Sequence, residues 1–132
     1  MRSKGVTLVS IIDDLNRKLD RLMMQPDNAD LYNAIGTILC RLKDWDNAER
    51  YLARAYALSP PDRDILCNYT VALYRKQKYG EAVSVCRMGL ELAPQDPGFL
   101  QKLADIYYLQ GAYEEAEKTY RILHTASDKV GS

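Results

Sequence analysis

The chain has 132 residues, and its 18 Lys and Arg residues are balanced by 18 Asp and Glu residues, so the formal net charge is zero. This length is enough for one domain that buries its own core without disulfides or metals. Because no block of basic residues stands out, the composition argues against a nucleic-acid-binding protein.

The first segment, residues 1–25, predicts an amphipathic helix from about residue 7 to 24, with Thr7 or Ser10 as its cap. Its apolar residues recur every three or four positions: Leu8, Ile11, Ile12, Leu15, Leu19, Leu22 and Met23. The apolar run is too short to span a membrane and no small-residue cleavage site follows it, so we expect a cytoplasmic chain. This helix should cap the next segment, or else dimerise or dock on a partner.

The segment 26–128 contains three similar stretches of sequence that begin at equal intervals along the chain. Two columns of this repeat hold only small side chains, which are Gly36, Thr70 and Ala104 in one and Ala48, Ala82 and Ala116 in the other. A third column holds an aromatic ring, at Trp45, Tyr79 and Tyr113. Self-similarity at a constant period of this size indicates a stacked array in which neighbouring units complete each other's core.

Each period predicts two antiparallel helices joined by a short turn, because the apolar spacing is helical. The units are 29–62, 63–96 and 97–128, followed by a tail at 129–132, and the expected helices are 29–42, 45–58, 63–76, 79–92, 97–110 and 113–126. Asn28, Asp62 and Asp96 can cap the first helix of each unit. A glycine inside a helix, Gly89, indicates either close packing or local slack.

These residues resemble the tetratricopeptide repeat, whose signature is W-x2-L-G-x2-Y, then A-x3-F, then P. The matching positions are Tyr32, Ile35, Gly36, Leu39, Ala48, Leu52 and Pro60 in the first unit, Leu66, Tyr69, Thr70, Leu73, Ala82, Cys86 and Pro94 in the second, and Leu100, Leu103, Ala104, Tyr107, Ala116 and Tyr120 in the third. Asp128 stands where the third proline is usual. The resemblance implies an all-α fold, a right-handed α-solenoid of three helix-turn-helix units preceded by one helix.

Residues suited to catalysis are scarce. The chain lacks phosphate-binding, dinucleotide-binding, zinc-protease and nucleophile-elbow motifs, and His124 is its single histidine. Cys40, Cys67 and Cys86 have no metal-ligand spacing and fit reduced, buried or half-buried thiols. We therefore expect no enzyme activity, no cofactor and no metal.

The resemblance also implies that the first helix of each unit lines an inner wall that binds a peptide or helix of a partner. By column, this inner wall comprises Asn33, Thr37, Arg41, Asn68, Val71, Tyr74, Arg75, Gln101, Lys102, Asp105 and Tyr108. Some co-chaperones of the family grip a C-terminal carboxylate at positions matching Asn33, Thr37, Asn68, Gly98 and Lys102. Only Asn68 is retained and Lys102 keeps its charge, so we do not expect that clamp.

The sequence thus favours a small adaptor or scaffold with a protein partner and with neither nucleic acid binding nor membrane insertion. Two alternatives remain open. The chain is similar to the small three-repeat chaperones of bacterial secretion systems, and it also fits a self-assembling component of a larger machine. The stretch after His124 is too short and polar for a capping helix, so apolar surface should stay exposed on the last unit. A homo-oligomer could form there or through the N-terminal helix.

Overall fold

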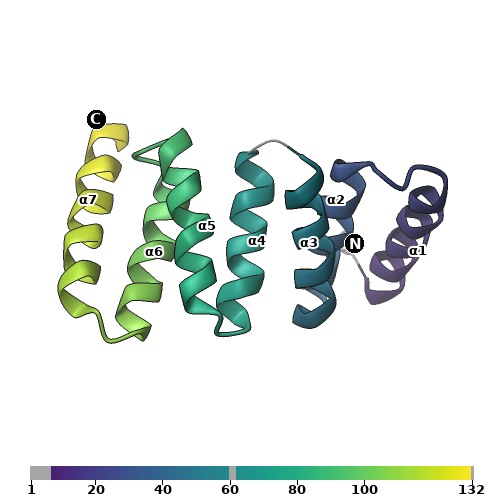
Figure 1. Ribbon diagram of the computed structural model, residues 1–132, viewed down its shortest axis with the longest axis horizontal. Helices are drawn as coiled ribbons and strands as arrows, with labels where there is room; N and C mark the ends of the chain where they lie inside the picture. Colours follow the sequence, from purple (N-terminus) through teal and green to yellow (C-terminus); the bar gives the residue numbers. More distant parts are fainter. Residues whose placement is uncertain (1–6, 60–61, 132) are drawn as a thin grey trace, which may run out of the picture.

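The computed structural model describes residues 7–59 and 62–131, with side chains described as far as Thr125. Residues 1–6 of the N-terminal segment and Pro60 lie outside the described residues. Seven α-helices in the described ranges form one row (Figure 1). They are α1 Leu8–Met24, α2 Ala29–Arg41, α3 Trp45–Leu58, α4 Arg63–Arg75, α5 Tyr79–Leu92, α6 Pro97–Leu109 and α7 Tyr113–Gly131.

The predicted helix ends are confirmed to within one residue, with the exception of α7. Thr7 caps α1 in a capping box with Ser10, and the side chains of Asn28, Asp62 and Asp96 accept backbone N–H groups at the starts of α2, α4 and α6. The prediction that α7 ends near residue 126 is wrong, because the helical backbone continues to Gly131. Prolines follow α3 and α5 closely, whereas Asp128 replaces the proline after α7 and does not break the helix.

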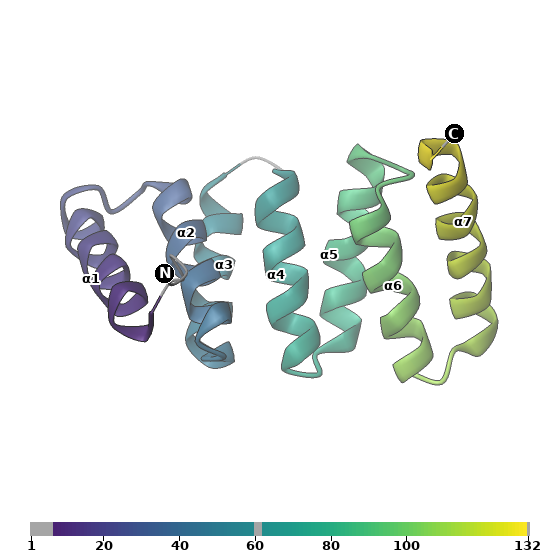
Figure 2. The same cartoon turned by 180° about the vertical axis from the view of Figure 1, so that it is seen from behind.

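The helices pack in chain order, and the first helices of successive units also contact each other. The backbones of α2 and α4, and those of α4 and α6, approach closely, whereas among the described residues the backbones of α3 and α5, and those of α5 and α7, do not. Helices α3 and α5 meet through side chains, since the Tyr56 hydroxyl donates to Sδ of Met88 at 3.0 Å. The row of first helices is therefore the more closely spaced side of the stack, which makes it the concave side. Figure 2 shows the stack from behind, with α6 in front of α5.

The core consists of two clusters that cross the boundaries between units. One joins α2 and α3 to Ala72 of α4, and the other joins α4 and α5 to Phe99, Leu103 and Ile106 of α6. The small-side-chain columns are buried at all six positions, Gly36, Ala48, Thr70, Ala82, Ala104 and Ala116. Each pair of neighbouring units thus shares a core cluster, as expected for a stacked array.

Close packing explains the glycines at Gly36 and Gly89. A Cβ at Gly36 would lie 2.5 Å from Cγ of Leu52, and a Cβ at Gly89 would lie 2.4 Å from the ring of Phe99. The alternative of local slack at Gly89 is therefore wrong. The obstacle at Gly36 is the side chain of Leu52, not a backbone.

In the turn inside each unit, the residue at one fixed position of the repeat adopts the left-handed backbone conformation. Lys43, Gln77 and Gly111 have φ values of 62°, 63° and 81°, and they occupy the same column of the repeat. The N–H of the following residue returns to the helix in every case, for example from Lys78 to the Leu73 carbonyl at 2.9 Å. This is the Schellman motif, in which glycine is the favoured residue.

We predict that Gln77→Gly stabilises the protein by up to about 1 kcal/mol, because a side chain with a Cβ is strained in this conformation. Urea unfolding followed by circular dichroism measures the difference. The matched control is Gly111→Ala, which places a Cβ in the same conformation and should lower the free energy of unfolding by about 1 kcal/mol. Equal stability of Gln77→Gly and the wild type would contradict the assigned strain.

Helix α1 covers one side of the first unit without burying any residue completely. Leu15, Leu19 and Leu22 pack against the cluster that contains Ile35 and Leu39. This placement fits the expected capping role. The flank of α1 next to these three leucines is apolar and exposed, at Leu8, Val9, Ile12, Met23 and Met24.

The three cysteines are free thiols within the helical packing. Cys40 and Cys67 are half-buried, and Cys86 is buried with its Sγ donating to the Phe99 carbonyl at 3.3 Å. Burial raises the pKa of all three thiols, and that of Cys86 to about 12. The predicted burial of the three cysteines is confirmed.

Candidate functional site

The inner wall predicted from the sequence is formed entirely by the first helices of the units. Asn33, Thr37 and Arg41 lie on α2; Asn68, Val71, Tyr74 and Arg75 on α4; and Gln101, Lys102, Asp105 and Tyr108 on α6. None of the eleven side chains is fully buried. Since α4 contacts both α2 and α6 on the concave side, these residues can face a common ligand.

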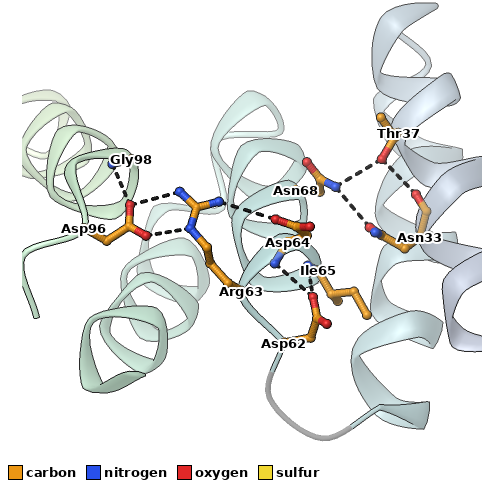
Figure 3. A network of polar contacts seen from close by, with 9 residues as sticks. All are labelled: Asn33, Thr37, Asp62, Arg63, Asp64, Ile65, Asn68, Asp96 and Gly98. Carbon is orange, nitrogen blue, oxygen red and sulfur yellow. Dashed lines mark hydrogen bonds and ion pairs between the residues drawn. The ribbon is translucent and has the colours of Figure 1, made fainter. Parts of the chain in front are cut away.

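A hydrogen-bonded group joins α2 and α4 at one end of the inner wall. Nδ2 of Asn68 donates to Oδ1 of Asn33 at 3.0 Å and to Oγ1 of Thr37 at 3.1 Å (Figure 3). Thr37 donates in turn to the backbone carbonyl of Asn33 at 2.8 Å. Both amide hydrogens of Asn68 are therefore used within the protein, which leaves its carbonyl oxygen to accept a bond from a partner.

Cations and aromatic rings gather where α4 faces α6. The ammonium nitrogen of Lys102 lies 5.3 Å from the ring centroid of Tyr74. The guanidinium carbon of Arg75 lies 5.8 Å from the same centroid and 5.5 Å from that of Trp45 in α3. Such stacked cations present positive charge beside apolar ring surface, which can hold an acidic side chain next to an apolar one.

The third polar group links α6 to α7. Asp105 accepts from Nε2 of Gln101 at 3.0 Å and from the hydroxyl of Tyr120 at 2.5 Å. The hydrogen bond to Asp105 raises the pKa of Tyr120 to about 12, so the phenol stays protonated and donates. Gln101 and Asp105 are thereby held in fixed positions at the surface of α6.

The structure does not bring the remaining predicted residues into these groups. In the described part of the chain no hydrogen bond or ion pair joins Arg41 or Val71 to another inner-wall residue. Tyr108 packs edge-on against Tyr113, with ring centroids 5.3 Å apart, and lines a groove between α6 and α7. Tyr108 thus belongs to the end of the stack as much as to the inner wall.

The groove between α6 and α7 is a surface whose lining the sequence analysis did not assign. It has a volume of about 760 Å³, and its lining includes Tyr108, Tyr113, Ala116, Tyr120 and Arg121. The repeat could have indicated this groove, because Tyr74 and Tyr79, at the positions equivalent to Tyr108 and Tyr113, make the same ring contact one unit earlier, with centroids 6.3 Å apart. An aromatic pair that spans the turn therefore marks this surface in both units.

The junction between the second and third units is held by a bidentate ion pair. Arg63 donates from Nε to Oδ2 of Asp96 at 2.6 Å and from its terminal nitrogen to Oδ1 at 3.0 Å (Figure 3). Asp96 also accepts from the backbone N–H of Gly98, and its side chain is only 9% exposed. The Arg63 guanidinium is the main cause that lowers the pKa of Asp96.

We predict that this carboxylate contributes to the acid sensitivity of the protein. Because the folded pKa of Asp96 is lowered, its stabilising effect is complete above the ordinary Asp value of 3.8 and is lost as the pH falls through the lower folded value. Asp96→Asn keeps a capping oxygen but removes the charge. The stability gap between wild type and Asp96→Asn should therefore shrink between about pH 5 and pH 2, which unfolding curves at each pH would show. A constant gap would contradict this.

No group of three or more His, Cys, Asp or Glu residues suited to a metal ion occurs among the described residues. Within the same residues, none of the helices combines the length and the apolar character needed to cross a bilayer.

Comparisons with known proteins support the architecture independently. Models of the tetratricopeptide repeat match residues 73–128, 17–63 and 33–97. Among solved structures, MamA from Desulfovibrio magneticus RS-1, residues 41 to the end, superposes with a TM-score of 0.88 at 14% identity, covering 95% of this chain and 71% of that one. The structure of MamA from MSR-1 gives a TM-score of 0.84 at 18% identity, covering 92% and 70%. At these identities the likeness shows the fold.

Two curated relatives from Drosophila melanogaster share part of the sequence. The protein O-mannosyl-transferases Tmtc1 and Tmtc2 are both 32% identical to this chain, over 96 and 84 residues. These segments cover 72% and 63% of this chain but 11% and 9% of the relatives, so the chain spans about a tenth of their length. With the repeat models matching most of the chain and the helices stacked in pairs, the chain belongs to the tetratricopeptide repeat family.

Proposed function

We propose that this protein is a non-catalytic adaptor that holds a short segment of a partner protein, as an extended peptide or a helix, along the inner wall. Tetratricopeptide repeats are in general protein–protein interaction modules. The observation that supports the proposal is the contact of α2 with α4 and of α4 with α6, which would let polar and aromatic side chains from three units face one partner segment.

The chemistry of the inner wall suits a segment with mixed side chains. The Asn68 carbonyl can accept a hydrogen bond, and the rings of Tyr74 and Trp45 can cover apolar groups. Lys102 and Arg75 both supply positive charge beside the ring of Tyr74. We therefore expect a preferred ligand to carry at least one carboxylate next to an apolar residue.

A random peptide library displayed on phage tests the proposal. Peptides selected on the wild-type protein would be synthesised, and their affinities measured by titration calorimetry. We expect Tyr74→Ala combined with Lys102→Ala to weaken binding by roughly 10- to 100-fold, since each residue supplies about 1 kcal/mol or more at a partly desolvated site. Thermal unfolding would show whether the variant is folded.

The matched control changes exposed residues on second helices, away from the inner wall. Arg50→Ala combined with Glu91→Ala removes one positive and one negative charge from α3 and α5. This control should bind the selected peptides with wild-type affinity. Peptides that bind the inner-wall variant as tightly as the wild type would overturn the proposal.

A further inference from the structure

A pocket of about 340 Å³ lies where α1, α2 and α3 come together, at one end of the row (Figure 1). In the described part of the chain the backbone of α1 approaches that of α2 but not that of α3, which leaves room for the pocket between α1 and α3. The volume is within the range of about 300–1,000 Å³ that is usual for ligand pockets. Its lining comprises Leu22, Tyr32, Asn47, Arg50, Tyr51 and Arg54, none of which belongs to the inner wall.

The two charged residues of this lining are both arginines. Arg50 and Arg54 are four positions apart on α3, so they are neighbours on one face of the helix. Among the described residues neither guanidinium donates a hydrogen bond to another residue, although each carries five N–H groups. The carboxylate of Asp27 lies 3.7 Å from Arg54, beyond hydrogen-bond distance, and is itself 81% exposed. Two like charges at this spacing repel each other, and an anion bound between them would relieve the repulsion.

Aromatic rings hold Arg54 in position beside the pocket. Its guanidinium carbon lies 5.8 Å from the ring centroid of Tyr32. The Tyr32 hydroxyl donates to the Pro26 carbonyl at 3.0 Å, and the Tyr32 ring packs against that of Tyr51 with the centroids 5.9 Å apart. A guanidinium stacked on a ring keeps the N–H groups at its edge free, so Arg54 can still donate to a ligand.

A second, more apolar pocket adjoins the first one. It has a volume of about 310 Å³, shares Asn47 and Tyr51 with the first pocket, and is otherwise lined by Leu15, Leu19, Ile35, Leu39 and Asp44. The Asp44 carboxylate is engaged at the start of α3, where it accepts from the backbone N–H of Asn47 at 3.3 Å and from Nδ2 of Asn47 at 2.9 Å. A ligand with an anionic group in the first pocket can therefore place an apolar group in the second.

We propose that Arg50 and Arg54 bind a phosphate monoester whose carbon side is apolar. One guanidinium satisfies both oxygens of a carboxylate, whereas a phosphate monoester has three terminal oxygens and can accept from two guanidinium groups at once. The ester can belong to a small molecule or to a phosphorylated protein side chain. Because the two sites share no residue, this binding is independent of the inner wall, and an unphosphorylated segment held there does not require Arg50.

Nuclear magnetic resonance of the labelled chain at constant ionic strength tests the proposal. Phenyl phosphate is the probe, and benzoate, which carries the same ring on a carboxylate, is the matched ligand. We expect saturable shifts at Arg50, Tyr51 and Arg54, with phenyl phosphate binding at least about tenfold more tightly than benzoate. Inorganic phosphate should shift the same residues with lower affinity, because it leaves the apolar pocket empty. A peptide with phosphoserine between two leucines identifies the source. Tighter binding than that of phenyl phosphate indicates a protein side chain, and weaker binding indicates a small molecule.

Two pairs of substitutions at exposed arginines separate the pocket from general electrostatic attraction. Arg50→Gln combined with Arg54→Gln should weaken binding of phenyl phosphate by at least about tenfold, and Arg50→Gln alone by roughly 3- to 10-fold. The control, Arg87→Gln combined with Arg121→Gln, removes the same charge from α5 and α7 and should bind as the wild type does. A control that loses as much affinity as the pocket variant would overturn the proposal. A wild type that binds benzoate as tightly as phenyl phosphate, or shows no saturable shift on α3, would also overturn it. Thermal unfolding confirms that each variant is folded.

Discussion

Phe99→Ala is expected to lower the free energy of unfolding by about 3–5 kcal/mol, a large part of the stability of a domain of this size. Phe99 is the largest fully buried side chain, and it belongs to α6 while packing in the cluster of α4 and α5. Its removal would leave a cavity at the boundary between the second and third units. Urea unfolding followed by circular dichroism measures the loss.

The control for this prediction is Leu92→Ala on α5, where 53% of the side chain is exposed. Its effect should stay within about 0.5 kcal/mol. If Phe99→Ala cost no more than the control, units two and three would not depend on a shared core. A separate, earlier transition for α6 and α7 in the same experiment would support the assignment of Phe99 to the seam between units.

Gly89→Ala is expected to destabilise the protein by about 1–3 kcal/mol, although alanine is the better helix former by about 1 kcal/mol. The new Cβ would lie 2.4 Å from the Phe99 ring, so the ring or the helix must shift. Gly80→Ala is the matched control in the same helix, because nothing lies within 4 Å of its added Cβ. That control should leave the stability unchanged or slightly higher.

A double variant separates packing from helix propensity. Phe99→Leu shortens the group that meets the added Cβ, so Gly89→Ala should cost clearly less in the Phe99→Leu background than in the wild type. If Gly89→Ala instead made the protein as stable as Gly80→Ala does, the close contact between Gly89 of α5 and Phe99 of α6 would be contradicted.

The fold was largely predictable because the repeat supplies three copies of each signal. The columns of Gly36 and Ala48 indicate close helix packing. Asn28, Asp62 and Asp96 mark the start of the first helix of each unit. Two features lay outside that signal. Lys43 and Gln77 adopt the left-handed conformation that Gly111 alone suggests from its residue type, because the Schellman turn is imposed by the helix pair that it joins. The second feature is the length of α7, which continues past Asp128 because no proline stands at that position.

The inner wall was predictable as a set of columns but not as a set of contacts. Asn68 bonds to Asn33 and Thr37 across the seam between α2 and α4, and this pairing depends on how two units are rotated relative to each other. Tyr120 fills a core column of the repeat, yet its hydroxyl reaches Asp105 at the surface. A single unit's sequence does not contain such distances between units, since they arise from the superhelix.

The most direct test of the inner wall is to map a bound peptide by nuclear magnetic resonance. A peptide selected from the library would be titrated into the isotopically labelled chain, and the amide shifts would be followed residue by residue. The account predicts that the largest changes fall on α2, α4 and α6, centred on Asn68, Tyr74 and Lys102. Changes confined to α3 and α5, or to the groove between α6 and α7, would contradict it.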